Sequence, residues 1–441
     1  MSIVYASPAL KAQALWPVDR VKDHVSKIGS GVTPSGGSAG YLDAGVPLLR
    51  SQNVHFDGLR LDDVAYIADE THKEMRGSRL QARDVLLNIT GASIGRCAFV
   101  PDDFGEGNVN QHVCIVRTTP RLDHKFLTYS LCAPWGQDQI FASFTGASRQ
   151  GLGQRDLGAI QIPLPPLSEQ QRIAGYLDAS CALIDAAVAA KRRQLLTLDA
   201  LRSTLISRAV THGLNSKVAM KSSGLDWAPD VPVHWRVQQI KRLCSLVRGL
   251  FTHRPRNDPA LYDGAYPFIQ TGDITAAGKY IRTHSQTLNE LGLSASKQFP
   301  RGTLVMSIAA NIGDVAILDF EACFPDSMIG MIPRPKTNLD FLYYLMRAMH
   351  VIMLRSAVQS TQLNLNYVRI GTNFAPVPPP KEQAAIAEYL DSKEHEFHLL
   401  SSTIETQIAT LTSYRKSLIH ECVTGQRRIT EADINRIKVN G

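Results

Sequence analysis

The sequence predicts an α+β fold in which two similar globular α/β domains are separated by two long antiparallel helices with pseudo-two-fold symmetry. Three observations predict it. A segment that begins at Pro163 recurs at Pro376, each copy continues for more than forty residues without a gap, and a domain-sized segment precedes each copy. Both helices can make equivalent contacts only if they pack antiparallel, as in an isologous dimer.

The repeat is a direct match at an offset of 213 residues (376 minus 163). Ten of the sixteen aligned positions in 163–178 and 376–391 are identical, and the register still pairs Arg202 with Arg415. Because internal repeats determine the architecture of a chain, this match is the first feature to interpret. It predicts a duplicated protein.

Each copy has the spacing of one continuous helix. In the first copy apolar residues recur every three or four positions through Leu177, Ile184 and Leu198, and the second copy has a matching stripe through Leu390 and Leu411. At 1.5 Å per residue such a helix is a rod of roughly 65 Å. One such stripe is typical of the core helix of an ordinary globular domain, but two in register favour a pair of helices that pack on each other.

The ends of both predicted helices carry the expected residues. Prolines precede each copy, where a helix must begin because proline cannot donate within it. Ser168 with Gln171 fits a capping box at the start of the first helix. Gly213 and Gly425 follow the predicted helix ends, where glycine is favoured.

The composition is that of a globular protein, with 441 residues of which 44% are hydrophobic and 20% are charged. The net charge of +7 is compatible with a polyanion partner without proving one. We expect no membrane span, because the apolar run 182–190 is interrupted by Asp185, and we find no signal peptide. Seven cysteines without C-x-x-C spacing argue against disulfides and zinc. These features predict a cytoplasmic protein.

The repeat divides the chain into five predicted segments. They are a first globular domain (1–162), a central helix (163–213), a second globular domain (214–375), a C-terminal helix (376–425) and a tail (426–441). In the first domain we predict a loop over 28–37, strands over 46–54, 84–90 and 113–117, a short helix over 125–132 and a loop over 146–153.

The second domain repeats this order with small slips in register. The segments 266–274, 302–314 and 339–345 correspond to the first two strands and the short helix, and Trp235 falls opposite Trp16. The loops 33–41 and 252–263 are unrelated. One scaffold that displays two sets of contacts would show this contrast, and so would drift of unconstrained loops after an old duplication.

We find no catalytic or metal-binding constellation. The segment 272–280 misses the glycine spacing of a phosphate-binding loop. In addition, Tyr280 occupies the position at which that loop has the serine or threonine whose hydroxyl binds the metal. Asp102 with Asp123 and Lys125 fits a metal-dependent nuclease only loosely, and chance explains it better. His395 and His398 have helical spacing but fit a solvated helix face better than a metal site. We therefore expect no catalytic residue, no metal and no cofactor in this chain.

The polar loops of both domains are typical of nucleic-acid contacts. Arginine reads guanine, and asparagine or glutamine reads adenine, through paired hydrogen bonds in the major groove, while lysine, serine and threonine suit phosphates. The residues that we predict to contact double-stranded DNA are Arg50, Ser51, Gln52, Asn53, Arg96, Arg149, Gln150 and Arg155 in the first domain and Arg254, Arg256, Gln270, Thr271, Lys279, Arg282, Gln362, Asn364 and Asn366 in the second.

Taken together, the chain resembles the specificity subunits of type I restriction-modification systems over essentially its whole length. The resemblance rests on the stretch 165–178, on its echo at 378–391, and on the lead-ins 224–227 and 232–235. Two features depart from the pattern. Pro380-Lys381 stands where the first copy has Leu167-Ser168, which leaves the second helix without that cap, and the N-terminus is less like the lead-in.

The resemblance implies two target recognition domains, each reading one half of a split DNA sequence, with the conserved helices setting the unspecified gap. It also implies that two modification subunits, which bind S-adenosylmethionine and methylate adenine, dock on those helices, and that restriction (motor) subunits can join them. The residues that we predict at the partner-subunit interface are Glu169, Gln170, Tyr176, Glu382, Gln383 and Tyr389.

Two alternatives stay open from the residues alone. A duplicated coiled-coil scaffold without a DNA role would share the repeat, and salt-dependent binding to duplex DNA separates it from a specificity subunit. A self-sufficient methyltransferase or nuclease is the second alternative. It would need the catalytic motifs that we do not find, and incubation with DNA and a methyl donor tests it.

Overall fold

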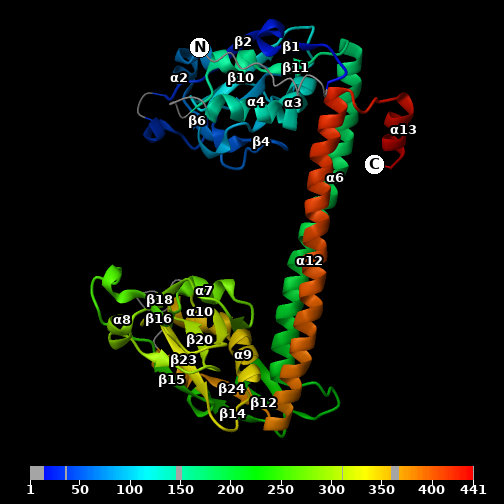
Figure 1. Cartoon of the computed structure of the whole chain (residues 1–441). Coiled ribbons are helices and arrows are strands. Elements are labelled where there is room, and N and C mark those ends of the chain that lie inside the picture. Colours follow the sequence, from blue (N-terminus) through cyan, green and yellow to red (C-terminus); the bar gives the residue numbers. More distant parts are fainter. Residues whose placement is uncertain (1–13, 35–36, 146–150, 310, 359–366, 441) are drawn as a thin grey trace. The chain divides into compact units, whose positions relative to one another are not determined.

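The computed structural model describes residues 14–34, 37–145, 151–309, 311–358 and 367–440, and it divides into two compact units (Figure 1). Unit 1 comprises Met1–Arg192 and Glu405–Gly441, and unit 2 comprises Arg193–Ile404. The helices α6 (Leu167–His212) and α12 (Pro380–Thr424) each contribute one segment to each unit. Each unit therefore combines one globular domain with parts of both long helices, and the predicted fold class is confirmed.

The domain of unit 1 is built on a four-stranded sheet with the order β2-β10-β7-β8 and a three-stranded sheet with the order β6-β3-β9. Its strands are β1 (Val18–Arg20), β2 (Val25–Ser30), β3 (Val46–Leu49), β4 (Val54–His55), β5 (Gly58–Leu59), β6 (Ala65–Ile67), β7 (Val85–Asn88), β8 (Cys97–Phe99), β9 (Asn108–Val109), β10 (Val113–Thr118) and β11 (Gln161–Pro163). Its helices are α2 (Asp69–Glu74), α3 (His124–Cys132), α4 (Pro134–Thr145) and α5 (Gln154–Ala159), and α13 (Glu431–Asn440) follows α12.

The domain of unit 2 has a five-stranded sheet with the order β15-β23-β20-β21-β17 and a four-stranded sheet with the order β18-β16-β22-β19. Its strands are β12 (Met220–Leu225), β13 (Ala228–Pro232), β14 (Arg236–Gln239), β15 (Cys244–Arg248), β16 (Tyr262–Phe268), β17 (Tyr280–Ile281), β18 (Gln286–Leu288), β19 (Gln298–Phe299), β20 (Leu304–Ser307), β21 (Val315–Leu318), β22 (Ala322–Cys323), β23 (Met328–Pro333) and β24 (Phe374–Val377). Its helices are α7 (Thr271–Ala276), α8 (Glu290–Ser294), α9 (Leu339–Ala348), α10 (His350–Val358) and α11 (Tyr367–Thr372).

The two domains share one topology, as the repeated landmarks predict. In unit 1 strand β3 pairs antiparallel with β6 and parallel with β9, and in unit 2 strand β16 pairs antiparallel with β18 and parallel with β22. The central strands β7 and β20 are buried along their whole length, because their apolar side chains are covered on both faces. The strands β17 and β19 extend the sheets of unit 2.

Three local predictions need correction or fall outside the described residues. Strand β2 extends to Ser30, so the first residues of the predicted 28–37 loop belong to a sheet, where they pair with β10. Part of the predicted loop 146–153 lies outside the described residues, and Gly151 forms a bridge to Thr90. The predicted strand 46–54 and its repeat 266–274 are extended only in their first part, because β3 is followed by a helical turn over Ser51–Asn53 and β16 is followed by helix α7.

In each unit a segment of α6 packs antiparallel against a segment of α12 (Figure 1). Buried apolar side chains of both helices join the core of the adjoining domain. In unit 1 they include Ile173, Leu177, Ile184, Leu418 and Val423. In unit 2 they include Ile206, Val210, Ile386 and Leu390. The long helices are therefore stabilised by tertiary burial in both units.

The helix ends follow the repeat with one exception. Helix α6 begins at Leu167, so Ser168 lies inside the first turn and is not the N-cap of the predicted capping box. Helix α12 begins at Pro380, where the fixed φ of proline suits a first helical residue. The predicted C-terminal glycines are confirmed, since Gly213 and Gly425 have φ of 72° and 83°.

The two helix ends are also covered alike. A Cβ on Gly213 would lie 3.1 Å from the Trp235 ring, and a Cβ on Gly425 would lie 2.5 Å from Nε1 of Trp16. The predicted correspondence of the two tryptophans is therefore confirmed, and each one packs where only glycine leaves room.

Helix α6 contains an apolar window. By length and composition α6 could cross a membrane, with a mean hydropathy of 1.5 over 18 residues, of which 33% are buried. The prediction of no membrane span rests on uninterrupted apolar runs, whereas a mean hydropathy tolerates isolated acids such as Asp178 and Asp185. One helix of this kind is weak evidence for a span, because core helices of soluble proteins have the same composition.

Gly313 lies in the turn after β20 and offers a test of the fold. Its φ is 90°, and an added Cβ would clash with Cδ2 of His350. We expect Gly313→Ala to lower the free energy of unfolding by about 3 kcal/mol through backbone strain and overpacking. Urea denaturation measures this, with Gly278→Ala as the control, because a Cβ added to Gly278 would meet no atom within 4 Å. Equal stability of the two variants would contradict the expectation.

Candidate nucleic-acid interface

The two domains present polar residues on equivalent turns. In unit 1 the turn after β3 is closed by Asn53, whose Oδ1 accepts a bond of 2.9 Å from the backbone N–H of Arg50. In unit 2 the turn after β16 is closed by Asp273, whose Oδ2 accepts a bond of 2.7 Å from the backbone N–H of Gln270. One backbone geometry therefore carries different side chains in the two domains.

In unit 1 the carboxylate and carbonyl of Asp63 hold the predicted contact residues. The Arg50 guanidinium donates to the Asp63 carbonyl at 3.0 Å, and the Gln52 amide donates to the Asp63 carboxylate. Arg50 is only 23% exposed, and Gln52 is exposed. The Asn53 side chain is 1% exposed and binds the carbonyls of Arg60 and Asp63, so it shapes the turn and does not face solvent.

The other candidates of unit 1 differ in exposure. Ser51 is half-buried, and its carbonyl accepts a bond of 2.7 Å from Nδ2 of Asn88. Arg96 is half-buried, whereas Arg155 on α5 is exposed. Arg149 and Gln150 lie outside the described residues, as do Gln362, Asn364 and Asn366 of the second domain.

In unit 2 several polar side chains line one hollow of about 800 Å³. The predicted residues Arg256 and Gln270 belong to it, and so does Asn257 of the same polar loop as Arg256. Further lining residues that were not predicted are Gln286, Phe251, Tyr262 and Phe268. Gln286 starts strand β18, sixteen positions after Gln270, so only the pairing of β16 with β18 brings it to the site.

The polar groups of this hollow are held in place by partners. Nε2 of Gln270 donates to Oε1 of Gln286 at 2.8 Å, and the Arg256 guanidinium pairs with Asp326 at 2.5 Å. The glutamine pair offers the amide oxygen of Gln270 as an acceptor and the amide group of Gln286 as a donor. These are the two functions that the edge of an adenine requires.

Three further candidates of unit 2 lie near the surface. Arg254 is exposed and donates to the Phe251 carbonyl at 2.7 Å, whereas Thr271 is half-buried at the first residue of α7. Arg282 is 74% exposed and lies 3.6 Å from Asp319. Arg282 has the charge and exposure of a phosphate contact, whereas the Arg254 guanidinium is bonded to the carbonyls of Phe251 and His253.

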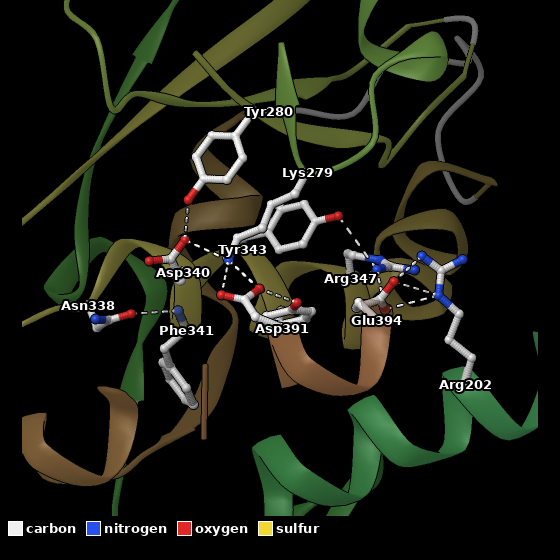
Figure 2. Close-up of polar contacts among 11 residues, drawn as sticks. Arg202, Lys279, Tyr280, Asn338, Asp340, Phe341, Tyr343, Arg347, Asp391 and Glu394 are labelled. Carbon is white, nitrogen blue, oxygen red and sulfur yellow. Dashed lines mark hydrogen bonds and ion pairs between the residues drawn. The ribbon is translucent and has the colours of Figure 1, made fainter. Parts of the chain in front are cut away.

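Lys279 is placed differently from the other candidates (Figure 2). Its side chain is 14% exposed, and its ammonium group lies 2.7 Å from Asp340 of α9 and 2.5 Å from Asp391 of α12. The Tyr344 hydroxyl also donates to Asp391, at 2.6 Å, and the Tyr280 hydroxyl donates to Asp340 at 2.8 Å. Lys279 therefore joins the domain of unit 2 to α12, and its charge is neutralised within the unit.

A second charged cluster lies beside the first (Figure 2). The Glu394 carboxylate of α12 accepts bonds from Arg202 of α6 at 2.8 and 2.9 Å and from Arg347 of α9 at 3.0 Å. Burial acts to raise the pKa of Glu394, but the hydrogen bonds and charges of the two arginines outweigh it, so the pKa is lowered. One carboxylate thus joins three helices of unit 2.

The glutamines of the repeated Glu-Gln pair are buried in equivalent positions. Oε1 of Gln170 accepts a bond of 2.8 Å from the Asp123 N–H, and Oε1 of Gln383 accepts one of 2.8 Å from the Asn338 N–H. Each glutamine is 1% exposed and also donates to the carbonyl five residues before it, at 2.9 Å. Both side chains therefore act within their own unit, and neither presents its amide on the surface.

The other predicted interface residues are partly engaged. Glu382 accepts a bond from Trp235 Nε1 at 2.8 Å and pairs with His234 at 2.7 Å. Tyr176 is 6% exposed in the core of unit 1. Tyr389 is half-buried against the core of unit 2, and Glu169 is half-buried beside Arg172.

Among the residues that the structure describes, no three His, Cys, Asp or Glu side chains gather as a metal site. The charged clusters around Lys279 and Glu394 are closed ion pairs, in which every carboxylate faces a cation. Their geometry is that of structural contacts.

Comparison with known proteins identifies relatives over nearly the whole chain. A protein from Methanocaldococcus jannaschii, provisionally named type I restriction enzyme MjaX specificity subunit, is 21% identical over 431 residues, which cover 94% of each chain. The type I restriction enzyme EcoKI specificity subunit of Escherichia coli K12 is 22% identical over 401 residues, covering 86% of this chain and 82% of that one.

Solved structures share the fold. A chain from a study of complex assembly and conformational transition of the type I R-M system superposes with a TM-score of 0.72 at 17% identity, covering 92% of this chain and 97% of that one. The HsdS subunit of Thermoanaerobacter tengcongensis superposes with a TM-score of 0.52 at 16% identity, covering 93% of this chain and 97% of that one.

The family model described as the type I restriction modification DNA specificity domain matches residues 71–195 and 232–410. These ranges take in most of both globular domains and parts of both long helices. The chain therefore belongs to the family of type I restriction-modification DNA specificity subunits.

Proposed function

We propose that this chain reads a split target on double-stranded DNA, with the domain of unit 1 reading one half-site and the domain of unit 2 reading the other. The observation that carries the proposal is the pair of equivalent turns after β3 and β16. They share one backbone geometry but present Arg50 and Gln52 in one domain and Gln270 and Thr271 in the other. Different side chains on one scaffold are what two different half-sites require.

The hollow of unit 2 supports this reading. Arg256, Asn257, Gln270 and Gln286 place guanidinium and amide groups around one concave surface. Such groups form the paired hydrogen bonds by which proteins distinguish guanine and adenine in the major groove. Exposed Arg282 adds a cation suited to a phosphate, which positions the protein without reading sequence.

We further propose that the long helices form the scaffold for two modification subunits, which hold S-adenosylmethionine and methylate adenine, and for restriction subunits. Helix surfaces of unit 2 leave large apolar side chains in solvent, since Leu196 and Leu201 of α6 and Leu399 and Leu400 of α12 are 51% to 71% exposed. Exposed leucines in such number favour a protein partner. In this proposal the chain acts in the cytoplasm, where it selects the DNA sequence and holds the other subunits, and those subunits carry out catalysis.

Gln270→Ala tests the assignment of half-sites. We expect methylation of the wild-type target to fall about tenfold to a hundredfold, because one lost base contact costs about 1–3 kcal/mol. In a randomised library the variant should relax one position of one half-site only. The measurement is the map of methylated adenines in cells that express the chain with its modification subunits, compared with cells that lack the chain.

The control is Gln407→Ala, which changes an exposed glutamine of α12 that belongs to neither turn. Equal weakening on every DNA sequence would make Gln270 a phosphate contact. If the methylated motif did not depend on the chain at all, and if binding to duplex DNA with the partner subunits were insensitive to salt, the chain would be a scaffold without a DNA role.

A further inference from the structure

The domains of the two units are attached to the long helices through equivalent aspartates. Asp178 of α6 and Asp391 of α12 are separated by the repeat offset of 213 residues (391 minus 178). In unit 1 the Tyr129 hydroxyl donates to Asp178 at 2.7 Å, and in unit 2 the Tyr344 hydroxyl donates to Asp391 at 2.6 Å. Each tyrosine comes from the corresponding helix, α3 or α9.

The lysine that completes this contact has a different origin in each unit. In unit 1 it is Lys125 of α3, whose Nζ lies 2.6 Å from Asp178. The N-caps Asp123 and Asn338 align α3 with α9, so the position of Lys125 corresponds to Asp340. At that position unit 2 has an acid, which would repel Asp391.

Lys279 resolves this repulsion from another element (Figure 2). It precedes β17, and its carbonyl accepts a bond of 2.9 Å from the N–H of Ile317 in β21, which ties its backbone to the five-stranded sheet. Its ammonium group lies between Asp340 and Asp391 and within 5.1 Å of the centre of the Tyr344 ring. The sheet, α9 and α12 thus meet at one cation.

We propose that Lys279 is a positioning residue, which sets the direction in which the domain of unit 2 presents its reading hollow relative to α12 and thereby narrows the range of gap lengths that the chain accepts. The inference rests on the proposed reading of a split target. In this inference Lys279 orients a domain and does not contact DNA, in contrast to the role predicted from the sequence. Lys279 belongs to the domain and Asp391 belongs to α12. Loss of the ion pair between them therefore weakens the attachment of the domain to α12 and leaves the hollow intact.

Lys279→Ala tests this in the complex with the modification subunits. Binding is measured on duplexes that keep both half-sites and differ by single base pairs in the gap. We expect the wild type to prefer one gap length, and the variant to lose most of that preference, with the penalty for one added or removed base pair falling about tenfold. The bases selected within each half-site should stay unchanged.

A second substitution supplies the rescue that a DNA contact would not show. In Lys279→Ala/Asp340→Lys a lysine stands at the position of Lys125, so it can reach Asp391 as Lys125 reaches Asp178. We expect this double variant to regain the narrow gap preference. The charge control is Arg282→Ala, which removes an exposed cation three residues away and should weaken all gap lengths alike.

The outcomes separate the possibilities. An unchanged gap preference in Lys279→Ala, or a change in the bases selected, would overturn the inference. A wild-type complex that bound every duplex alike would contradict the proposed function and this inference together. If Lys279→Ala fails to fold, Tyr344→Phe replaces it, since this change removes only the hydroxyl bond to Asp391. An unchanged gap preference in Tyr344→Phe would then contradict the positioning role of the contacts around Asp391.

Discussion

Glu394→Ala is expected to lower the free energy of unfolding of unit 2 by about 2–3 kcal/mol. The substitution leaves the guanidinium groups of Arg202 and Arg347 side by side without their shared carboxylate. The Glu394 side chain is 20% exposed, so the loss should fall below that of a fully buried pair but well above that of a surface pair. Urea denaturation followed by hydrogen exchange of unit 2 peptides measures it.

The effect should also depend on pH. The pKa of Glu394 is lowered in the folded chain, against the pull of burial, by Arg202 and Arg347. A carboxyl group with a lowered folded pKa contributes stability above its unfolded pKa, and this contribution is lost as the pH falls through the folded value. The difference in stability between wild type and Glu394→Gln should therefore be full at neutral pH and shrink in acid, below the ordinary carboxyl pKa of 4.5.

The matched control is Glu396→Ala on the same helix. Glu396 pairs with Lys393 at 2.8 Å, but its side chain is 55% exposed, so its removal should change stability by about 0.5 kcal/mol or less. A stability difference for Glu394→Gln that persisted unchanged into acid would show that the arginines do not depend on a charged carboxylate.

Gln383→Ala is expected to destabilise unit 2 by about 3 kcal/mol, since it leaves buried polar groups without partners and opens a cavity. Gln383 is 1% exposed and accepts the N–H of Asn338, the N-cap of α9. Its amide also donates to the carbonyls of Pro378 and Lys336, at 2.9 and 3.3 Å. The residue therefore fixes the turn before α12 to the start of α9.

Gln170→Ala should have a similar effect on unit 1, because Gln170 makes the same bonds around Asp123 and α3. Thermal and urea denaturation of both variants measure the effect, with exposed Gln407 of α12 as the control for a glutamine on a long helix. If both variants kept near-wild-type stability but assembled poorly with modification subunits, these glutamines would instead be contacts with partner subunits.

The repeated Glu-Gln motif holds each unit together from within. Glu-Gln after a proline pair was predicted to bind partner subunits, but the glutamine is a buried clamp in both units. In unit 2 the glutamate also binds the Trp235 indole and His234. Side chains of the same motif can serve the fold or a partner, and the sequence shows only that both copies have them.

For polar loop residues, too, the sequence does not show whether a side chain serves the fold or a partner. Gln270 and Arg256 were predicted from residue type, and they line one hollow. Lys279 and Asn53 were predicted on the same grounds, but both are largely buried: Asn53 is bonded within its own domain, and Lys279 is paired with Asp340 and with Asp391 of α12. Gln286 was missed because strand pairing, and not sequence proximity, brings it beside Gln270.

Duplication and helical periodicity were enough to predict two domains of one topology and two long helices, because a repeat in register and a spacing of 3.6 residues are properties of the chain read locally. The burial of a side chain cannot be predicted from local sequence in this way. Whether Lys279 or Gln383 faces solvent depends on which distant segments pack over it. Asp340 and Asp391 reach Lys279 from α9 and α12, and Asn338, the N-cap of α9, reaches Gln383. Residue type gives a side chain its chemistry, but only packing between segments far apart in the chain decides whether that chemistry is available to DNA.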